Sequence, residues 1–195
     1  MSDAAPIDVS SPRFTAFEGQ RRLISGSLQE VALAVKRRAA SPASSASGPV
    51  LIFDDSSGRT IDFDPRGSDA QMLARLAPTD VAAQPRGRGR PRLGVVAREV
   101  TLLPRHWQWL GTQAGGASVA LRRLVEEASR ASRAKDDMRR RQDTAYRFMV
   151  AIAGDQPGFE EAARALFAAD QPRLLAEIAR WPSDVREHLV ALAYP

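Results

Sequence analysis

The stretch from Arg86 to Ala128 constrains this chain most, because it cannot build a core by itself. A short extended run, Arg98 to Leu102, precedes two helical patterns that begin near Pro104 and at Ser118, with Gly115-Gly116 between them. One strand and two helices of about 30 residues bury too little apolar surface to fold alone. Pairing the strand with its copy in a second chain would solve this problem. The sequence therefore predicts a homodimer.

An arginine-rich run opens this stretch. Residues 86–92 are Arg-Gly-Arg-Gly-Arg-Pro-Arg. Arginines at alternate positions on a thin glycine backbone can lie along the narrow minor groove of A·T-rich DNA, where the negative potential is strong. Arg88-Gly89-Arg90-Pro91 resembles the core of the AT-hook, although Gly87 stands where the hook usually has a proline. We expect this arm to contact DNA through Arg86, Arg88, Gly89, Arg90, Pro91 and Arg92.

The segment after the arm, residues 94–129, resembles the ribbon-helix-helix family of DNA-binding dimers. The likeness is carried by Val100-Thr101-Leu102, Pro104, Trp107, Leu110, Gly116-Ala117-Ser118 and the run from Leu121 to Ala128. In that family the paired strands enter the major groove, and the second helix directs its N-terminus at phosphate. The resemblance implies DNA contacts from Arg98, Glu99, Thr101, Ser118 and Arg122. Glu99 departs from the family's usual longer or basic side chains, which puts base-specific readout in doubt.

The charge distribution also favours a polyanionic partner. The net charge is +5, but residues 81–150 hold 15 Lys and Arg against 6 Asp and Glu, whereas the flanks are near neutral or acidic. A basic block between such flanks is typical of a nucleic-acid footprint. Its alternative is a solvated linker followed by a charged helix face.

The flanking regions predict an α+β protein. Residues 1–12 read as a disordered tail and 77–93 as a flexible linker that carries the arginine run. Residues 13–76 predict a small ββαββα domain, in which Ser27 with Glu30 and later Ser68 begin helices. Residues 130–195 predict an all-helical region, first as an extension of the second helix through Arg147. The aromatic residues Phe159, Phe167 and Trp181 are expected in its core.

The sequence leaves two further functional classes open. Asp54, Asp55, Asp62 and Asp64 lie in one predicted hairpin, and clustered carboxylates can hold a hard cation such as Mg²⁺ in a metal-dependent enzyme. The competing interpretation is turn chemistry and protection of a sheet edge. His106 and His188 have no recognised nucleophile motif nearby, so no catalytic residues, metal or cofactor are assigned. A protein-interaction module of antitoxin type, binding a partner through residues 130–195, is the other alternative.

The whole chain also resembles a bacterial family known only as a domain of unknown function. The residues that carry this likeness are Gly89-Arg90-Pro91, the run from Leu93 to Trp107 and the run from Gly154 to Ala162. The absence of cysteine excludes disulfides and thiolate metal sites. With no secretory signal or apolar membrane segment in view, we expect a soluble cytoplasmic protein. The sequence favours a DNA-binding dimer that prefers A·T-rich duplex, as a transcriptional regulator or nucleoid-associated protein.

Overall fold

The computed structural model describes residues 13–40, 48–76, 96 and 98–195 and divides the chain into two compact units. Unit 1 combines residues up to 77 with residues 137–195, and unit 2 comprises residues 78–136. The fold class is α+β, as the sequence predicts. The sequence predicts residues 13–76 and 130–195 as separate regions, whereas residues 137–195 share unit 1 with the sheet. Local periodicity cannot reveal this arrangement, because it depends on contacts between segments far apart in the chain.

A four-stranded antiparallel sheet forms the centre of unit 1. Its strands are β1 (Phe14–Glu18), β2 (Arg21–Gly26), β3 (Val50–Asp54) and β4 (Arg59–Ile61), in the spatial order β2-β1-β3-β4. Helices α1 (Leu28–Ala39) and α2 (Asp69–Leu76) complete the predicted ββαββα order. Each of these helices begins at a reciprocal serine cap, since Ser27 and Ser68 exchange hydrogen bonds with the side chain and backbone of the residue three positions on.

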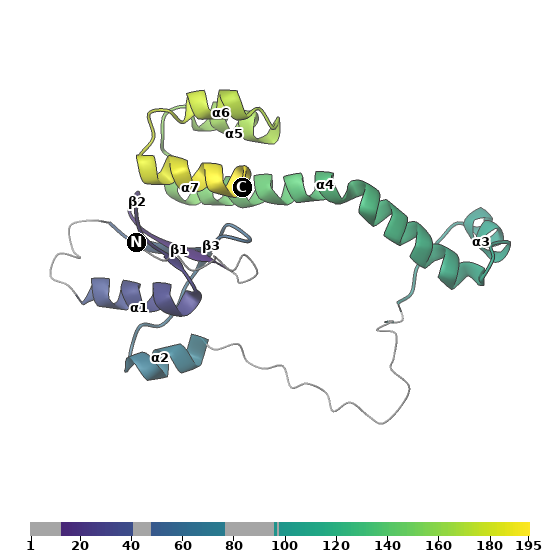
Figure 1. The fold of residues 1–195 in the computed structure, drawn as a ribbon, viewed down its shortest axis with the longest axis horizontal. Coiled ribbons are helices and arrows are strands. Elements are labelled where there is room, and N and C mark those ends of the chain that lie inside the picture. The colour runs from purple at the N-terminus through teal and green to yellow at the C-terminus, as the bar shows by residue number, and fades with distance from the viewer. Residues whose placement is uncertain (1–12, 41–47, 77–95, 97) are drawn as a thin grey trace, which may run out of the picture. The chain divides into compact units, whose positions relative to one another are not determined.

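Alternation along the strands gives the sheet two covered faces (Figure 1). Phe14, Ala16 and Ile52 pack with Val31 of α1 on one face. Phe17 and Phe53 belong to the larger core on the other face, where they meet Phe148 and the C-terminal helices. The register places Thr15 opposite Phe53 and Ala16 opposite Ile52, as a period of two requires.

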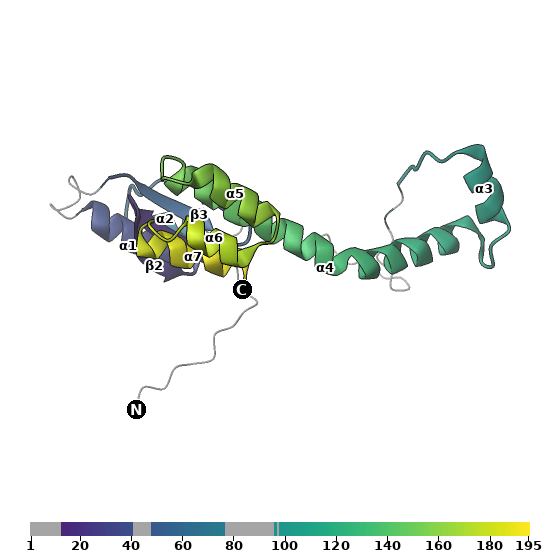
Figure 2. The same ribbon diagram turned by 90° about the horizontal axis from the view of Figure 1, so that it is seen from above.

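The C-terminal residues form a long helix and three shorter ones. These are α4 (Gly116–Ala153), α5 (Phe159–Phe167), α6 (Gln171–Glu177) and α7 (Ser183–Ala193). Figures 1 and 2 show α5, α6 and α7 gathered beside the C-terminal end of α4, where Met149, Leu166, Leu174 and Leu189 share the larger core. The predicted extension of the second helix through Arg147 is confirmed.

Aromatic packing in this region differs from the expectation at one position. Trp181 is buried and donates from Nε1 to the carbonyl oxygen of Pro157 at 2.9 Å, and Phe159 stacks beside it. Phe167, however, is 49% exposed. It is the last residue of α5, so its ring meets only the edge of the core, where Tyr146 lies 5.2 Å away between ring centroids.

Unit 2 contains α3 (Pro104–Gly111) and the first part of α4. Proline at the first position and an extended Leu103 begin α3 as predicted. The predicted start of the second helix at Ser118 is wrong, because α4 starts at Gly116. Gly115 and Gly116 both have positive φ, at 84° and 77°, so these glycines turn the chain and Ser118 lies inside the first helical turn. Within the described ranges, no helix combines the length and apolar character needed to cross a bilayer.

Candidate functional site: an exposed unit and a basic cavity

The sequence-predicted DNA contacts fall into two groups. Arg86, Arg88, Gly89, Arg90, Pro91 and Arg92 lie outside the described residues. Arg98, Glu99, Thr101, Ser118 and Arg122 are all exposed in unit 2. Residues 98–103 form no strand with another described segment of this chain. A ladder between two copies, as the sequence predicts, would need the second copy to form.

Large apolar side chains are unusually exposed in unit 2. The set with its exposed fractions is Val96 (71%), Val100 (55%), Leu103 (47%), Trp107 (44%), Trp109 (48%), Val119 (44%), Leu124 (38%) and Val125 (66%). We call these eight residues the apolar set. Leu110 and Ala120, by contrast, are each 2% exposed. This many exposed large apolar side chains in one small unit favours a surface that another molecule covers.

The cations of unit 2 are also largely without internal partners. Arg130 pairs with Glu126 at 3.5 Å across one turn of α4. Among the described residues no ion pair involves Arg98, Arg105, Arg122, Arg123, Arg133 or Lys135. These side chains are all exposed. Their charge is therefore available to an external anion.

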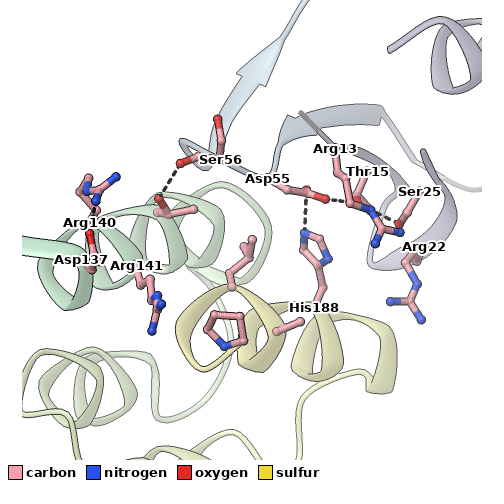
Figure 3. Close-up of a pocket in the computed structure, with 14 residues that line it drawn as sticks. Arg13, Thr15, Arg22, Ser25, Asp55, Ser56, Asp137, Arg140, Arg141 and His188 are labelled. Atoms are coloured by element: carbon pink, nitrogen blue, oxygen red, sulfur yellow. Dashed lines mark hydrogen bonds and ion pairs between the residues drawn. The ribbon is translucent and has the colours of Figure 1, made fainter. Parts of the chain in front are cut away.

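A second candidate lies in unit 1, where the sheet meets α4 and α7 (Figure 3). A buried polar chain crosses this junction. The Thr15 hydroxyl donates to Asp55 Oδ2 at 2.9 Å, and Asp55 Oδ1 lies 3.2 Å from His188 Nε2. Thr15 is fully buried and His188 is 5% exposed. These three side chains connect β1, the β3–β4 turn and α7.

The polar chain does not resemble a hydrolytic triad. Both the Thr15 hydroxyl and its 2.9 Å neighbour Ser25 Oγ lie on the carboxylate side of Asp55, whereas a nucleophile must contact the imidazole that would take its proton. The His188 ring instead lies against Phe17 and Phe148, with centroid separations of 5.4 and 4.8 Å. These contacts favour a structural role for the three side chains, which hold β1, the β3–β4 turn and α7 together. The same side chains line a cavity.

That cavity has a volume of about 910 Å³ and a mainly basic rim. Its charged lining consists of Arg13, Arg22, Arg140, Arg141, Asp55 and Asp137. Arg22 pairs with Glu187 at 3.1 Å, and Arg140 pairs with Asp137. Among the described residues, Arg13 and Arg141 have no hydrogen-bonded or ionic side-chain partner. The sequence does not predict this site, because its residues come from four segments that are far apart in the chain.

Aspartates of the predicted cluster take part in other interactions. Asp54 accepts hydrogen bonds from the hydroxyls of Ser56 and Ser57, at 2.6 and 2.7 Å. Burial works against ionisation of Asp54, but these hydrogen bonds outweigh it and lower the pKa of the carboxyl below 3.8. Asp55 belongs to the polar chain. Over the described ranges, no three His, Asp or Glu side chains group as metal ligands.

Comparison with known proteins gives one match. A family model described as "Uncharacterized protein conserved in bacteria (DUF2239)" covers residues 13–193. No curated protein and no solved structure matches the chain.

Proposed function

We propose that this chain, which belongs to the DUF2239 family of uncharacterized proteins conserved in bacteria, binds double-stranded DNA as a homodimer. The observation that carries the proposal is the exposed apolar set of unit 2, which accompanies uncompensated cations in the same unit. A DNA-binding dimer accounts for both features. The apolar side chains would be covered by the second copy, and the cations would face phosphate.

We infer that a second copy of the chain covers the apolar set. Trp107 and Trp109 are two positions apart on α3, so they project in different directions from the helix, and each is nearly half exposed. A second copy would provide the same apolar residues in return, as a two-fold interface requires. Pairing of residues 98–102 between copies would add a hydrogen-bonded strand ladder.

We assign the DNA contacts to the arginine run and to unit 2. The cations of unit 2 follow directly in sequence after the arginine run of residues 86–92. In the proposal, Arg88 and Arg90 enter an A·T-rich minor groove, while Thr101 of the paired strands faces bases and Arg122 faces phosphate. Neutralising roughly six phosphates would make the logarithm of the binding constant fall steeply with the logarithm of salt concentration.

The test is a gel-shift series on A·T-rich and G·C-rich duplexes at several salt concentrations. Replacing Arg88 and Arg90 with Ala is expected to weaken binding most on the A·T-rich duplex. The control replaces Arg59 and Arg66, two exposed arginines of unit 1, and so removes the same charge. Equal losses on both duplexes would reject the minor-groove role, and no binding by the unchanged protein at low salt would reject the function.

A protein partner for the C-terminal helices is the second candidate. Val150, Phe167 and Leu175 are exposed large apolar residues of unit 1. A partner held there would tolerate the Arg88→Ala/Arg90→Ala change but lose affinity on Phe167→Ala/Leu175→Ala. A purified stoichiometric complex with the opposite response would reject this candidate.

A further inference from the structure

The two tryptophans of α3 lie on different sides of that helix. Successive residues of an α-helix turn by about 100°, so Trp107 and Trp109 project about 160° apart around the helix axis. Leu110, which is 2% exposed, lies between them and nearer to Trp107, at about 60° from it. A second copy that covers the Trp107 side therefore leaves the Trp109 side accessible.

The indole of Trp109 has no partner among the described residues. Its side chain is 48% exposed, and within the described ranges its ring N–H makes no hydrogen bond. Trp181, by contrast, is buried and donates to the carbonyl oxygen of Pro157. The backbone of Trp109 is nevertheless held in place, because its carbonyl oxygen accepts from the Thr112 hydroxyl at 2.8 Å and from the Gln113 amide at 3.4 Å. A half-exposed indole on a fixed backbone provides a flat surface for stacking.

The surroundings of Trp109 are cationic. Arg105 stands four positions earlier and so lies on the same face of α3. It is exposed and has no ionic or hydrogen-bonded side-chain partner in the part of the chain that the structure describes. The sequence from Val100 to Val125 contains three arginines and no Asp or Glu. Charge complementarity therefore favours an anionic occupant for this face.

An exposed indole beside an unpaired arginine matches the chemistry of a single strand of DNA. Each base offers a π-face that can stack on an aromatic side chain, while arginine neutralises the phosphates of the backbone. The bases of an intact duplex are stacked on one another, and a side chain reaches their faces only by separating two base steps. An acidic peptide would pair with Arg105 but would leave the indole without a ring to stack on.

We propose that the Trp109 face of α3 binds single-stranded DNA, with one base stacked on the indole and Arg105 on a phosphate. This inference rests on the proposed function and deepens it, because it adds unpaired strands to the DNA that unit 2 binds. It assigns Trp109, alone of the apolar set, to DNA rather than to the second copy. TA steps in A·T-rich duplexes unstack easily, so the duplex chosen by the arginine run is also one that readily exposes bases.

The experiment is fluorescence anisotropy of the full chain at low salt with three labelled probes: an oligo(dT) strand, an abasic strand of the same length and an A·T-rich duplex. The unchanged protein is expected to bind oligo(dT) more tightly than the abasic strand, because only oligo(dT) has bases to stack. Trp109→Ala should weaken oligo(dT) binding about tenfold, since one base–aromatic stack is lost, and should leave abasic binding unchanged. Trp109→Phe keeps an aromatic ring and should recover part of the affinity.

Two further variants separate stacking from charge and from self-association. Arg105→Ala should weaken binding to both single strands and reduce the slope of log K against log salt by about 0.7, the value for one phosphate contact on a single strand. Arg180→Ala removes an exposed arginine of unit 1 and is the matched control for charge. Trp107→Ala, on the other side of α3, should leave the ratio of oligo(dT) to abasic affinity unchanged.

The outcomes distinguish this inference from the duplex function. Equal binding of oligo(dT) and the abasic strand, or an unchanged oligo(dT) affinity in Trp109→Ala, would overturn the inference. Loss of self-association in Trp109→Ala without loss of oligo(dT) affinity would assign the indole to the second copy and would overturn it as well. A chain that binds the duplex but not oligo(dT) rejects the Trp109 site alone, whereas one that binds oligo(dT) but no duplex rejects the duplex function alone.

Discussion

The central aromatic cluster of unit 1 is buried, whereas both tryptophans of unit 2 are nearly half exposed. In unit 1, Phe17, Phe53 and Phe148 are fully buried and contact one another at centroid separations of 4.9 to 6.0 Å. In unit 2, Trp107 and Trp109 are 44% and 48% exposed. Burying an aromatic side chain is among the largest favourable contributions to folding and association. Unit 1 thus completes its core within one chain, whereas unit 2 retains apolar surface that a second molecule can cover.

The two units differ in apolar exposure because they are built from different parts of the chain. Unit 1 joins a sheet from the first part of the chain to helices from the last part, so its apolar faces cover one another. Unit 2 is drawn from one continuous stretch, in which a short helix lies beside a long one (Figure 1). We therefore expect unit 1 to be stable in a single chain and unit 2 to need a second molecule.

The largest effect is expected from Phe148→Ala in the core of unit 1. Phe148 contacts Phe17, Phe53 and His188, and the truncation leaves a cavity among all three. The free energy of unfolding should fall by about 3–5 kcal/mol, measured by urea denaturation. Val150→Ala is the control, because Val150 lies two positions away on α4 and is 50% exposed. A loss for Val150→Ala as large as that for Phe148→Ala would contradict the assignment of this core.

The next largest effect is expected at Gly58. This residue has a φ of 68°, and a Cβ added there would overlap the backbone carbonyl oxygen of Thr144. Gly58→Ala should therefore lower the free energy of unfolding by at least about 2 kcal/mol, from the left-handed backbone and the displaced helix together. Gly111→Ala in unit 2 is the comparison, since no atom lies near the new methyl group. Similar losses in both variants would show that the Gly58 contact is not tight.

Trp107→Ala tests whether the exposed apolar residues of unit 2 serve self-association. Urea denaturation at concentrations where the chain is single should change by less than about 0.5 kcal/mol, as for most surface substitutions. Self-association should weaken about tenfold, because central aromatic residues dominate interfaces. Arg105→Ala, on the same helix, should leave dimerisation nearly unchanged. A large loss of single-chain stability in the tryptophan variant would mean that unit 2 is closed within one chain.

The smallest effect concerns acid stability of the β3–β4 turn. Burial opposes ionisation of Asp54, yet the hydrogen bonds from Ser56 and Ser57 prevail and lower its folded-state pKa. A lowered folded-state pKa gives stability that is present above the unfolded-state value and is lost as pH falls through the folded-state value. Asp54→Asn should therefore flatten the decline of unfolding free energy below about pH 4. An unchanged decline between pH 5 and pH 2 would contradict this assignment.

The sequence predicts those parts of the structure that local rules govern. The reciprocal caps at Ser27 and Ser68, the strand alternation around Phe17 and Phe53 and the proline start of α3 all follow from near neighbours. The junction of Asp55 with His188 does not, because it depends on how α7 packs on the sheet. One signal was present: His188 stands between Val185 and Leu189, two buried residues of the same helix face. A polar residue in that position needs a buried partner.

The start of α4 and the aspartates of the hairpin show a second limit of prediction from sequence, which is that residue type alone does not fix a role. Ser118 has the residue type of a cap, but two glycines with positive φ turn the chain before it is reached. Asp54 and Asp55 have the residue type of metal ligands, but neighbouring hydroxyls and His188 engage them. In both cases residue type permits several roles, and backbone geometry selects among them.

In the proposed complex, two copies of unit 2 join on one duplex. Sedimentation velocity of the full chain with a fluorescent A·T-rich duplex at low salt measures stoichiometry directly. We expect two chains per duplex, and Trp107→Ala should shift assembly to higher protein concentration. A protein that sediments as a single chain beside free DNA would contradict it.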